Sequence, residues 1–105
     1  MLGELEQVVM LATLRLGREG YGVTIQEAVH RATGRDLTLG TIHKTLVRLE
    51  AKGMVASTMG EPTPQRGGRR KRHFELTAEG LRLLDATLRS LRRMSAGLPV
   101  GLEPS

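Results

Sequence analysis

Residues 66–72 read RGGRRKR, so cations occupy five of seven consecutive positions. The strand-like segment 73–76, HFEL, follows directly, which makes the basic segment the expected tip of a β-hairpin. Clustered like charges repel one another, and binding to a polyanion relieves that repulsion. A loop that only confers solubility is the alternative. We expect phosphate contacts from the five cations of this loop: Arg66, Arg69, Arg70, Lys71 and Arg72.

A second polar surface is predicted just upstream. The segment 38–53, TLGTIHKTLVRLEAKG, has a polar start, an apolar stripe and a terminal glycine, which is typical of a short helix. A helix fits the major groove of duplex DNA, where Lys and Arg can bind guanine or phosphate, and Thr can offer a hydroxyl to phosphate or a methyl group to thymine. An ordinary solvated helix face is the alternative. The candidate DNA contacts are Thr38, Thr41, Lys44, Thr45 and Arg48, opposite a stripe of Leu39, Ile42, Leu46 and Leu49, with His43 at the edge of the stripe.

Further elements must hold these two surfaces. Thr24 and Glu27 have capping-box spacing, so we expect a helix that begins after Thr24 and ends at Gly34. Residues 54–59 and 71–76 predict the two strands of the hairpin. Residues 4–16 predict a first helix with two apolar arcs, which calls for apolar neighbours on two sides. The first arc is Leu5, Val8, Val9, Ala12 and Leu16, and the second is Met10, Leu11 and Leu14.

The last predicted helix carries a leucine stripe after Thr77, which we expect to be its N-cap. Such a stripe is commonly part of a core. Here the first helix needs a second neighbour, and a terminal helix has little core of its own left to cover. We therefore expect a two-fold homodimer in which this helix packs on its counterpart and on the partner's first helix. The expected interface residues are Leu5, Val9, Leu81, Leu84, Leu88, Leu91 and Leu98.

Composition bounds the remaining possibilities. The 105 residues carry a net charge of +5 and no cysteine, so disulfides and thiolate metal sites are excluded. Three histidines without clustered carboxylates predict no metal, and the absence of any catalytic motif predicts no cofactor and no enzyme. One Phe, one Tyr and no Trp leave little for base stacking on single strands. The most apolar segment is too short to span a membrane and has the wrong flank for a signal peptide, so we expect a soluble, cytoplasmic protein.

These elements predict a mainly α fold with a small β-hairpin, a winged helix-turn-helix followed by a C-terminal dimerisation helix. We expect the DNA-binding domain at residues 1–77, the dimerisation helix at 78–98, and a disordered tail at 99–105.

Three blocks of the chain resemble the PadR-like transcriptional regulators: LGELEQVVMLATLRLGREGYG, LGTIHKTLVRLEAKGMV and RGGRRKRHFELTAEG. The resemblance covers residues 2 to about 96, and it implies a homodimeric winged helix-turn-helix protein that binds a palindromic operator, usually as a repressor. His43 and Lys44 stand where the family commonly has Tyr followed by Pro, so a tyrosine contact is not carried over. Relatives that hold flat aromatic drugs use interface aromatic residues, and this chain has no tryptophan, so any small-molecule effector is unknown.

The predicted function is therefore sequence-specific regulation of transcription by a homodimer on double-stranded DNA. Two alternatives stay open at this point. The basic loop could bind an acidic partner protein, or the chain could bind double-stranded RNA, which is recognised mainly by its shape.

Overall fold

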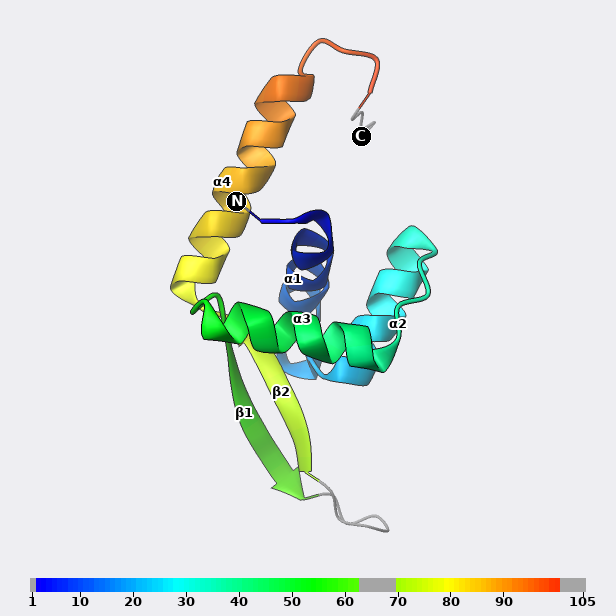
Figure 1. Cartoon of the computed structure of the whole chain (residues 1–105), viewed down its shortest axis with the longest axis vertical. Coiled ribbons are helices and arrows are strands. Elements are labelled where there is room, and N and C mark those ends of the chain that lie inside the picture. Colours follow the sequence, from blue (N-terminus) through cyan, green and yellow to red (C-terminus); the bar gives the residue numbers. More distant parts are fainter. Residues whose placement is uncertain (1, 63–69, 101–105) are drawn as a thin grey trace.

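The computed structural model describes residues 2–62 and 70–100, which form four α-helices, one short 3₁₀ helix and a two-stranded hairpin. Helices α1, α2 and α3 gather around one core, the hairpin extends from one end of them, and α4 leaves in the opposite direction (Figure 1). This arrangement confirms the mainly helical winged fold. The elements are α1 (Glu4–Leu16), η1 (Gly17–Glu19), α2 (Gly22–Thr33), α3 (Leu39–Ala51), β1 (Val55–Pro62), β2 (Arg70–Leu76) and α4 (Ala78–Ser95).

The core forms where the first three helices and the base of the hairpin meet. Both arcs of α1 contribute to it, since Val9 and Met10 are each fully buried. Leu11 and Leu14 remain 40% and 47% exposed, so part of the second arc is only partly covered by the described chain. The other fully or nearly fully buried apolar side chains are Ile25, Val29, Ile42, Leu46, Leu49, Val55, Phe74 and Leu84.

Local capping sets the ends of the helices. The Thr38 hydroxyl accepts a hydrogen bond from the Thr41 amide at 3.0 Å, so the predicted cap of α3 is confirmed. The prediction that α2 begins after Thr24 is wrong. Tyr21 is the residue before the helix, and Thr24 is the third residue inside it. The Tyr21 amide donates to the Thr24 hydroxyl at 2.9 Å. Gly34 ends α2 as predicted, because its φ of 75° lies in the left-handed region that favours glycine.

Strands β1 and β2 pair antiparallel, with Val55 opposite Leu76 and Ser57 opposite Phe74. The base of this hairpin is joined closely to α4. The Thr77 hydroxyl donates to the Gly53 carbonyl at 2.7 Å, and the Thr77 amide donates to the Met54 carbonyl at 3.1 Å. Gly80, in the first turn of α4, lies so close to Met54 that a Cβ there would be 2.0 Å from the Met54 carbonyl oxygen. The direction in which α4 leaves the domain therefore depends on this backbone contact.

Helix α4 is buried only along its first half. Leu84 and Thr87 are 1% and 5% exposed, whereas Leu91 and Met94 are 45% and 79% exposed. Two expected dimer contacts must be revised, because Val9 and Leu84 fill the core of the chain itself and have no free surface for a partner. Leu5 and Leu88 are partly buried against that core, while Leu81 and Leu98 are exposed. No helix of residues 2–62 and 70–100 is long and apolar enough to cross a membrane.

A partly buried ion pair ties α1 to the C-terminal end of α3, where Lys52 is 50% exposed. Lys52 donates to one carboxylate oxygen of Glu6 at 2.9 Å, and the Gly3 amide donates to the other at 3.0 Å. The Glu6 residue is only 7% exposed. The hydrogen bond from Lys52 lowers the pKa of Glu6 below its ordinary value, and the Gly3 amide acts in the same direction, while burial opposes both.

We expect Gly80→Ala to destabilise the fold by more than about 2 kcal/mol, because the new methyl group meets backbone that must move. Alanine is otherwise the better helix former by about 1 kcal/mol. Gly40→Ala in α3 is the matched control, since the nearest atom to its Cβ would be 3.8 Å away. Urea unfolding followed by circular dichroism, at one protein concentration, measures both. Equal stability of the two variants would contradict the proposed contact.

We expect Glu6→Gln to lower the free energy of unfolding by about 1 kcal/mol at pH 7, through loss of a charge-assisted hydrogen bond. A carboxyl whose pKa is lowered by folding stabilises the fold above its unfolded pKa, and this contribution disappears as the pH falls through the folded pKa. The difference between the two proteins should therefore shrink below about pH 4. Glu27→Gln in α2 is the control, because Glu27 is an exposed carboxylate on the surface of a helix. A gap that stays constant down to acid pH would rule out the ionic origin.

Candidate nucleic-acid interface

One face of α3 is free of the core and carries most of the polar residues predicted there. Thr38, Lys44 and Arg48 are exposed, and Thr41 is half-buried. Thr45 must be removed from the candidate contacts, because it is 1% exposed and its hydroxyl donates to the Thr41 carbonyl at 2.8 Å. The position of Thr45 on the helix explains why it is buried.

Thr45 follows Ile42 by three residues and precedes Leu49 by four, so it shares their face of the helix.

The free face also contains residues that were not predicted to lie there. Leu39 was assigned to the buried stripe but is 46% exposed, and Val47 is 42% exposed. His43 is exposed as well. Helical spacing could have identified Val47, which lies five residues after Ile42 and is thus on the opposite side of α3. Leu39 gives no such signal, because its exposure is set by the position of α2 and the hairpin.

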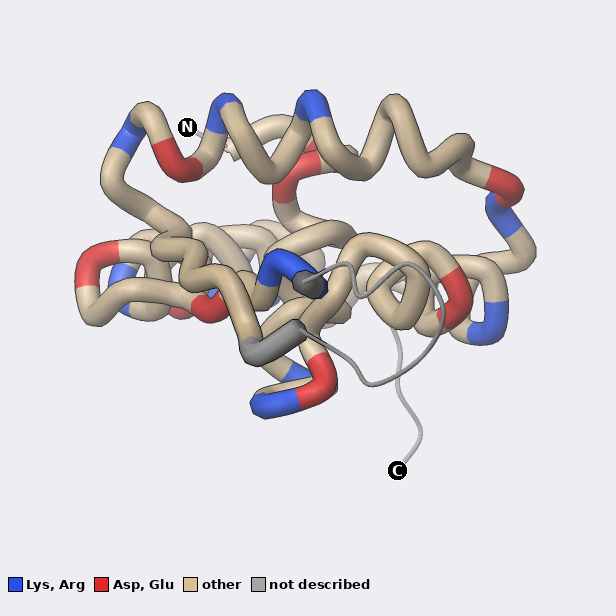
Figure 2. Tube along the Cα trace, turned by 90° about the horizontal axis from the view of Figure 1, so that it is seen from below, with Lys and Arg blue, Asp and Glu red and all other residues tan. Residues whose placement is uncertain are grey.

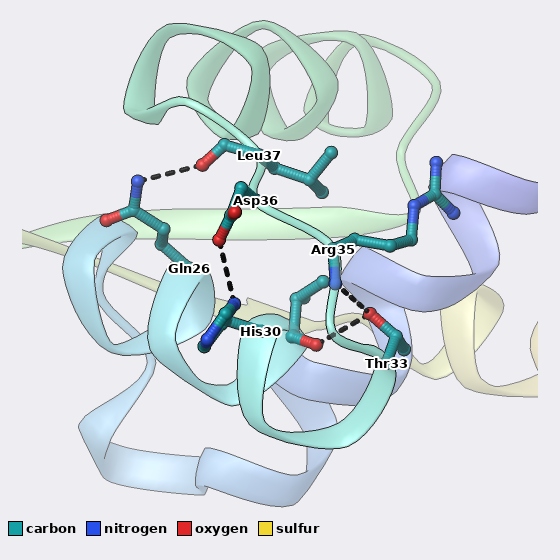
Figure 3. A network of polar contacts seen from close by, with 7 residues as sticks. Gln26, His30, Thr33, Arg35, Asp36 and Leu37 are labelled. Carbon is teal, nitrogen blue, oxygen red and sulfur yellow. Dashed lines mark hydrogen bonds and ion pairs between the residues drawn. The ribbon is translucent and has the colours of Figure 1, made fainter.

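The turn between α2 and α3 is held by polar contacts (Figure 3). Gln26 donates from its side-chain amide to the Leu37 carbonyl at 2.8 Å, and His30 Nδ1 lies 2.8 Å from a carboxylate oxygen of Asp36. The Arg35 guanidinium lies 3.5 Å from Glu4 at the start of α1. The part-buried bond from Gln26 joins α2 to the residue just before the Thr38 cap of α3, whereas the two exposed ion pairs contribute little.

The hairpin is braced against the end of α3 by a three-residue network. The Arg72 guanidinium donates to the Glu50 carboxylate at 3.2 Å and to the Ser57 hydroxyl at 3.1 Å, and Ser57 donates to Glu50 at 2.7 Å. The guanidinium carbon also lies 5.6 Å from the centroid of the Phe74 ring. Arg72 thus positions the hairpin, and its side chain is still 42% exposed for contact with an anion.

The segment before α2 attaches to the same hairpin. Gly20 accepts from the Phe74 amide at 2.8 Å, and a Cβ on Gly20 would lie 2.6 Å from the Phe74 carbonyl oxygen, so only glycine allows this approach. The Tyr21 and His73 rings meet edge to face at 5.8 Å, and the Lys71 ammonium lies 5.2 Å from the centroid of the Tyr21 ring. This places one cation of the predicted loop beside the start of α2.

Between these elements lies a groove of about 460 Å³. Its walls come from the start of α2, from Leu39 and His43 of α3, and from Lys71, Arg72 and Phe74 of β2. Seen from below, α3 runs along one edge of the molecule and carries cations on successive turns (Figure 2). The free face of α3 and the hairpin therefore border one continuous surface.

Arg66 and Arg69 of the predicted loop lie outside the described residues, as does the end of the predicted tail, residues 101–105. Arg70 begins β2, with its backbone opposite Pro62. Within the described part of the chain, no group of three or more His, Asp or Glu side chains is arranged to hold a metal ion.

Comparison with known proteins agrees with this architecture. The model of the transcriptional regulator PadR-like family matches residues 10–86. A PadR-like transcription factor from Bacteroides fragilis superposes with a TM-score of 0.72 at 19% identity, over 87% of this chain and 82% of that one. A Streptococcus transcriptional regulator gives a TM-score of 0.67 at 25% identity, over 87% and 84% of the two chains. A PadR family regulator from Clostridium difficile gives 0.64 at 24% identity, over 85% and 90%.

No curated protein matches the chain significantly. The family match nevertheless spans most of the sequence and includes α2, α3, the hairpin and the start of α4, which are the elements that build the surface described above. The chain therefore belongs to the PadR-like family of transcriptional regulators.

Proposed function

We propose that the chain is a homodimeric repressor that binds a palindromic operator in double-stranded DNA. The observation that carries this proposal is the groove between α3 and the hairpin, in which Leu39 and His43 of α3 lie beside Lys71 and the partly exposed Arg72 of β2. The exposed cations Lys44 and Arg48 extend the free face of α3 beyond this groove. A helix that enters the major groove with a cationic hairpin on the flanking backbone is one way for a small domain to combine base contacts with phosphate contacts.

A dimer accounts for the apolar residues that the single chain leaves exposed. Leu11 and Leu14 of α1 and Leu81, Leu91 and Met94 of α4 are each at least 40% exposed. Monomeric proteins rarely expose apolar side chains in contiguous groups, and packing them against a second copy would bury both helices. Two-fold symmetry would then place the two α3 helices in successive major grooves, about 34 Å apart. Bound across a promoter, such a dimer would block transcription.

Selection from a random pool of DNA duplexes tests the proposal as a whole. The expected product is an inverted repeat whose half-sites are centred about one helical turn apart. Competition with an RNA duplex of the same sequence and with an acidic polypeptide separates the two alternative functions. Stronger binding to either competitor, or a selected pool without an inverted repeat, would contradict the proposal. Raised transcription from the bound promoter in a strain that lacks the protein would establish repression.

The basic loop should supply much of the salt-dependent affinity. Replacing Arg69, Arg70 and Lys71 together with Ala removes three cations from each chain. We expect the slope of log K against log salt to become less steep by up to about 0.9 for each phosphate contact that is lost. Fluorescence anisotropy with the selected duplex at four or five salt concentrations measures this slope. An unchanged slope would show that the loop does not contact the DNA backbone.

The exposed half of α4 should be needed for association. Leu91→Glu places a charge on the apolar side of α4, at a residue that is 45% exposed in the single chain, so the fold should persist. We expect dimer dissociation to increase at least roughly tenfold, because the charge would have to be desolvated in the interface. Ala86→Glu adds the same charge on the opposite, exposed side of α4 and is the control.

Sedimentation equilibrium measures both variants. If Leu91→Glu dimerises as tightly as the unchanged chain, α4 does not form the interface in the proposed way.

A further inference from the structure

Two apolar side chains on α3 remain largely exposed to solvent. Val47 is 42% exposed and Leu39 is 46% exposed, and neither belongs to the buried core. Val47 lies three residues after Lys44 and four after His43, so it belongs to the same exposed face of the helix. The exposed side of α3 thus carries one apolar side chain near its middle and a second, Leu39, at its margin beside the groove to the hairpin.

The stability of α3 does not explain a valine at this position. A β-branched side chain loses rotamer freedom in a helix, and Lys, Arg, Gln or Ala would each be more favourable at an exposed site. Isolated apolar residues are ordinary on protein surfaces, but Val47 lies on the face that the proposed function directs into the major groove, and Leu39 lies about 80° from it around the helix axis, at the margin of that face. The expected dimer contacts lie on α1 and α4, so a second copy of the chain is not needed to account for them.

The spacing of the two residues suits base pairs in a groove. Leu39 and Val47 are eight residues apart, which is about 12 Å along the helix axis. At about 3.4 Å for each base pair, this distance spans three to four base pairs. Between them, Gly40 leaves the outer surface of α3 open, since a Cβ there would meet only the Thr38 hydroxyl oxygen at 3.8 Å. The helix backbone can therefore approach the bases closely at its N-terminal end.

We infer that Val47 and Leu39 determine operator specificity by contacting the C5 methyl groups of thymines in the major groove. Thymine is the one standard base that presents a methyl group there, and apolar side chains are its natural partners. Lys44, between the two, remains available for guanine or phosphate. This inference rests on the proposed function and adds to it the base that each half-site should contain.

Replacement of single thymines by deoxyuridine tests the inference, because it removes only the methyl group. In the selected duplex, each thymine of a half-site is replaced in turn, symmetrically in both half-sites, and the affinity of the full-length protein is measured by fluorescence anisotropy. We expect at least one position at which the loss of the methyl weakens binding roughly fourfold for each contact, as the burial of one methyl group implies. Two such positions should lie three to four base pairs apart.

Alanine variants of Val47 and Leu39 show which side chain contacts which thymine methyl group. In Val47→Ala, binding should no longer distinguish thymine from deoxyuridine at one of the sensitive positions, and Leu39→Ala should have the same effect at the other. Lys44→Ala is the control, since it should weaken binding to both duplexes equally and leave their ratio unchanged. Circular dichroism confirms that each variant is folded.

The outcomes separate this inference from the proposed function. Specific binding to an inverted repeat with no effect of deoxyuridine at any position would overturn the methyl contacts and leave the function intact. A methyl effect that persists fully in both Val47→Ala and Leu39→Ala would assign the contact to another residue and overturn the inference as well. Absence of any preferred duplex would refute the proposed function itself.

Discussion

The burial of one side of α3 is the constraint on which the rest of the structure depends. Ile42, Leu46 and Leu49 are fully buried against the other helices, and each contributes about 1.5–3 kcal/mol relative to an exposed side chain. A rotation of α3 by one residue would expose this set and move Lys44 or Arg48 toward the core, where an unpaired charge is strongly unfavourable. The same packing that stabilises the domain therefore decides which side chains can reach a ligand.

Polar contacts then set the position of the hairpin relative to that helix. Arg72 joins Glu50 of α3 to Ser57 of β1 and keeps part of its side chain exposed, so the proposed phosphate contact would not require breaking this network. Gly20 and Gly80 act through close backbone approaches, one to Phe74 of β2 and the other to Met54 at the base of the hairpin. Together these contacts hold the hairpin beside α3 and direct α4 away from both, which separates the proposed DNA surface from the proposed dimer surface.

Local sequence signals predicted much of this fold. Thr38 and Thr77 were identified as caps because a hydroxyl before an apolar period is a local pattern, and Gly34 because a left-handed helix end favours glycine. Thr24 was misassigned because its capping-box spacing to Glu27 suggested a helix start, whereas the helix begins one turn earlier. Thr45, Val9 and Leu84 were misjudged because periodicity tells which residues share a face but not how wide the buried part of that face is. The Arg72 network joins residues 22 and 15 positions apart, and no local pattern encodes it.

The central claim is that the exposed face of α3 and the start of β2 contact DNA. Amide NMR of the isotopically labelled protein tests this claim residue by residue. On titration with the selected duplex, the account predicts the largest shifts or line broadening at His43, Lys44, Val47 and Arg48, at the start of α2 and at Lys71. The end of α2 around Arg31 and the arginines of α4 should change little. Perturbations concentrated on Arg82, Arg89 and Arg93, with α3 unaffected, would contradict the account.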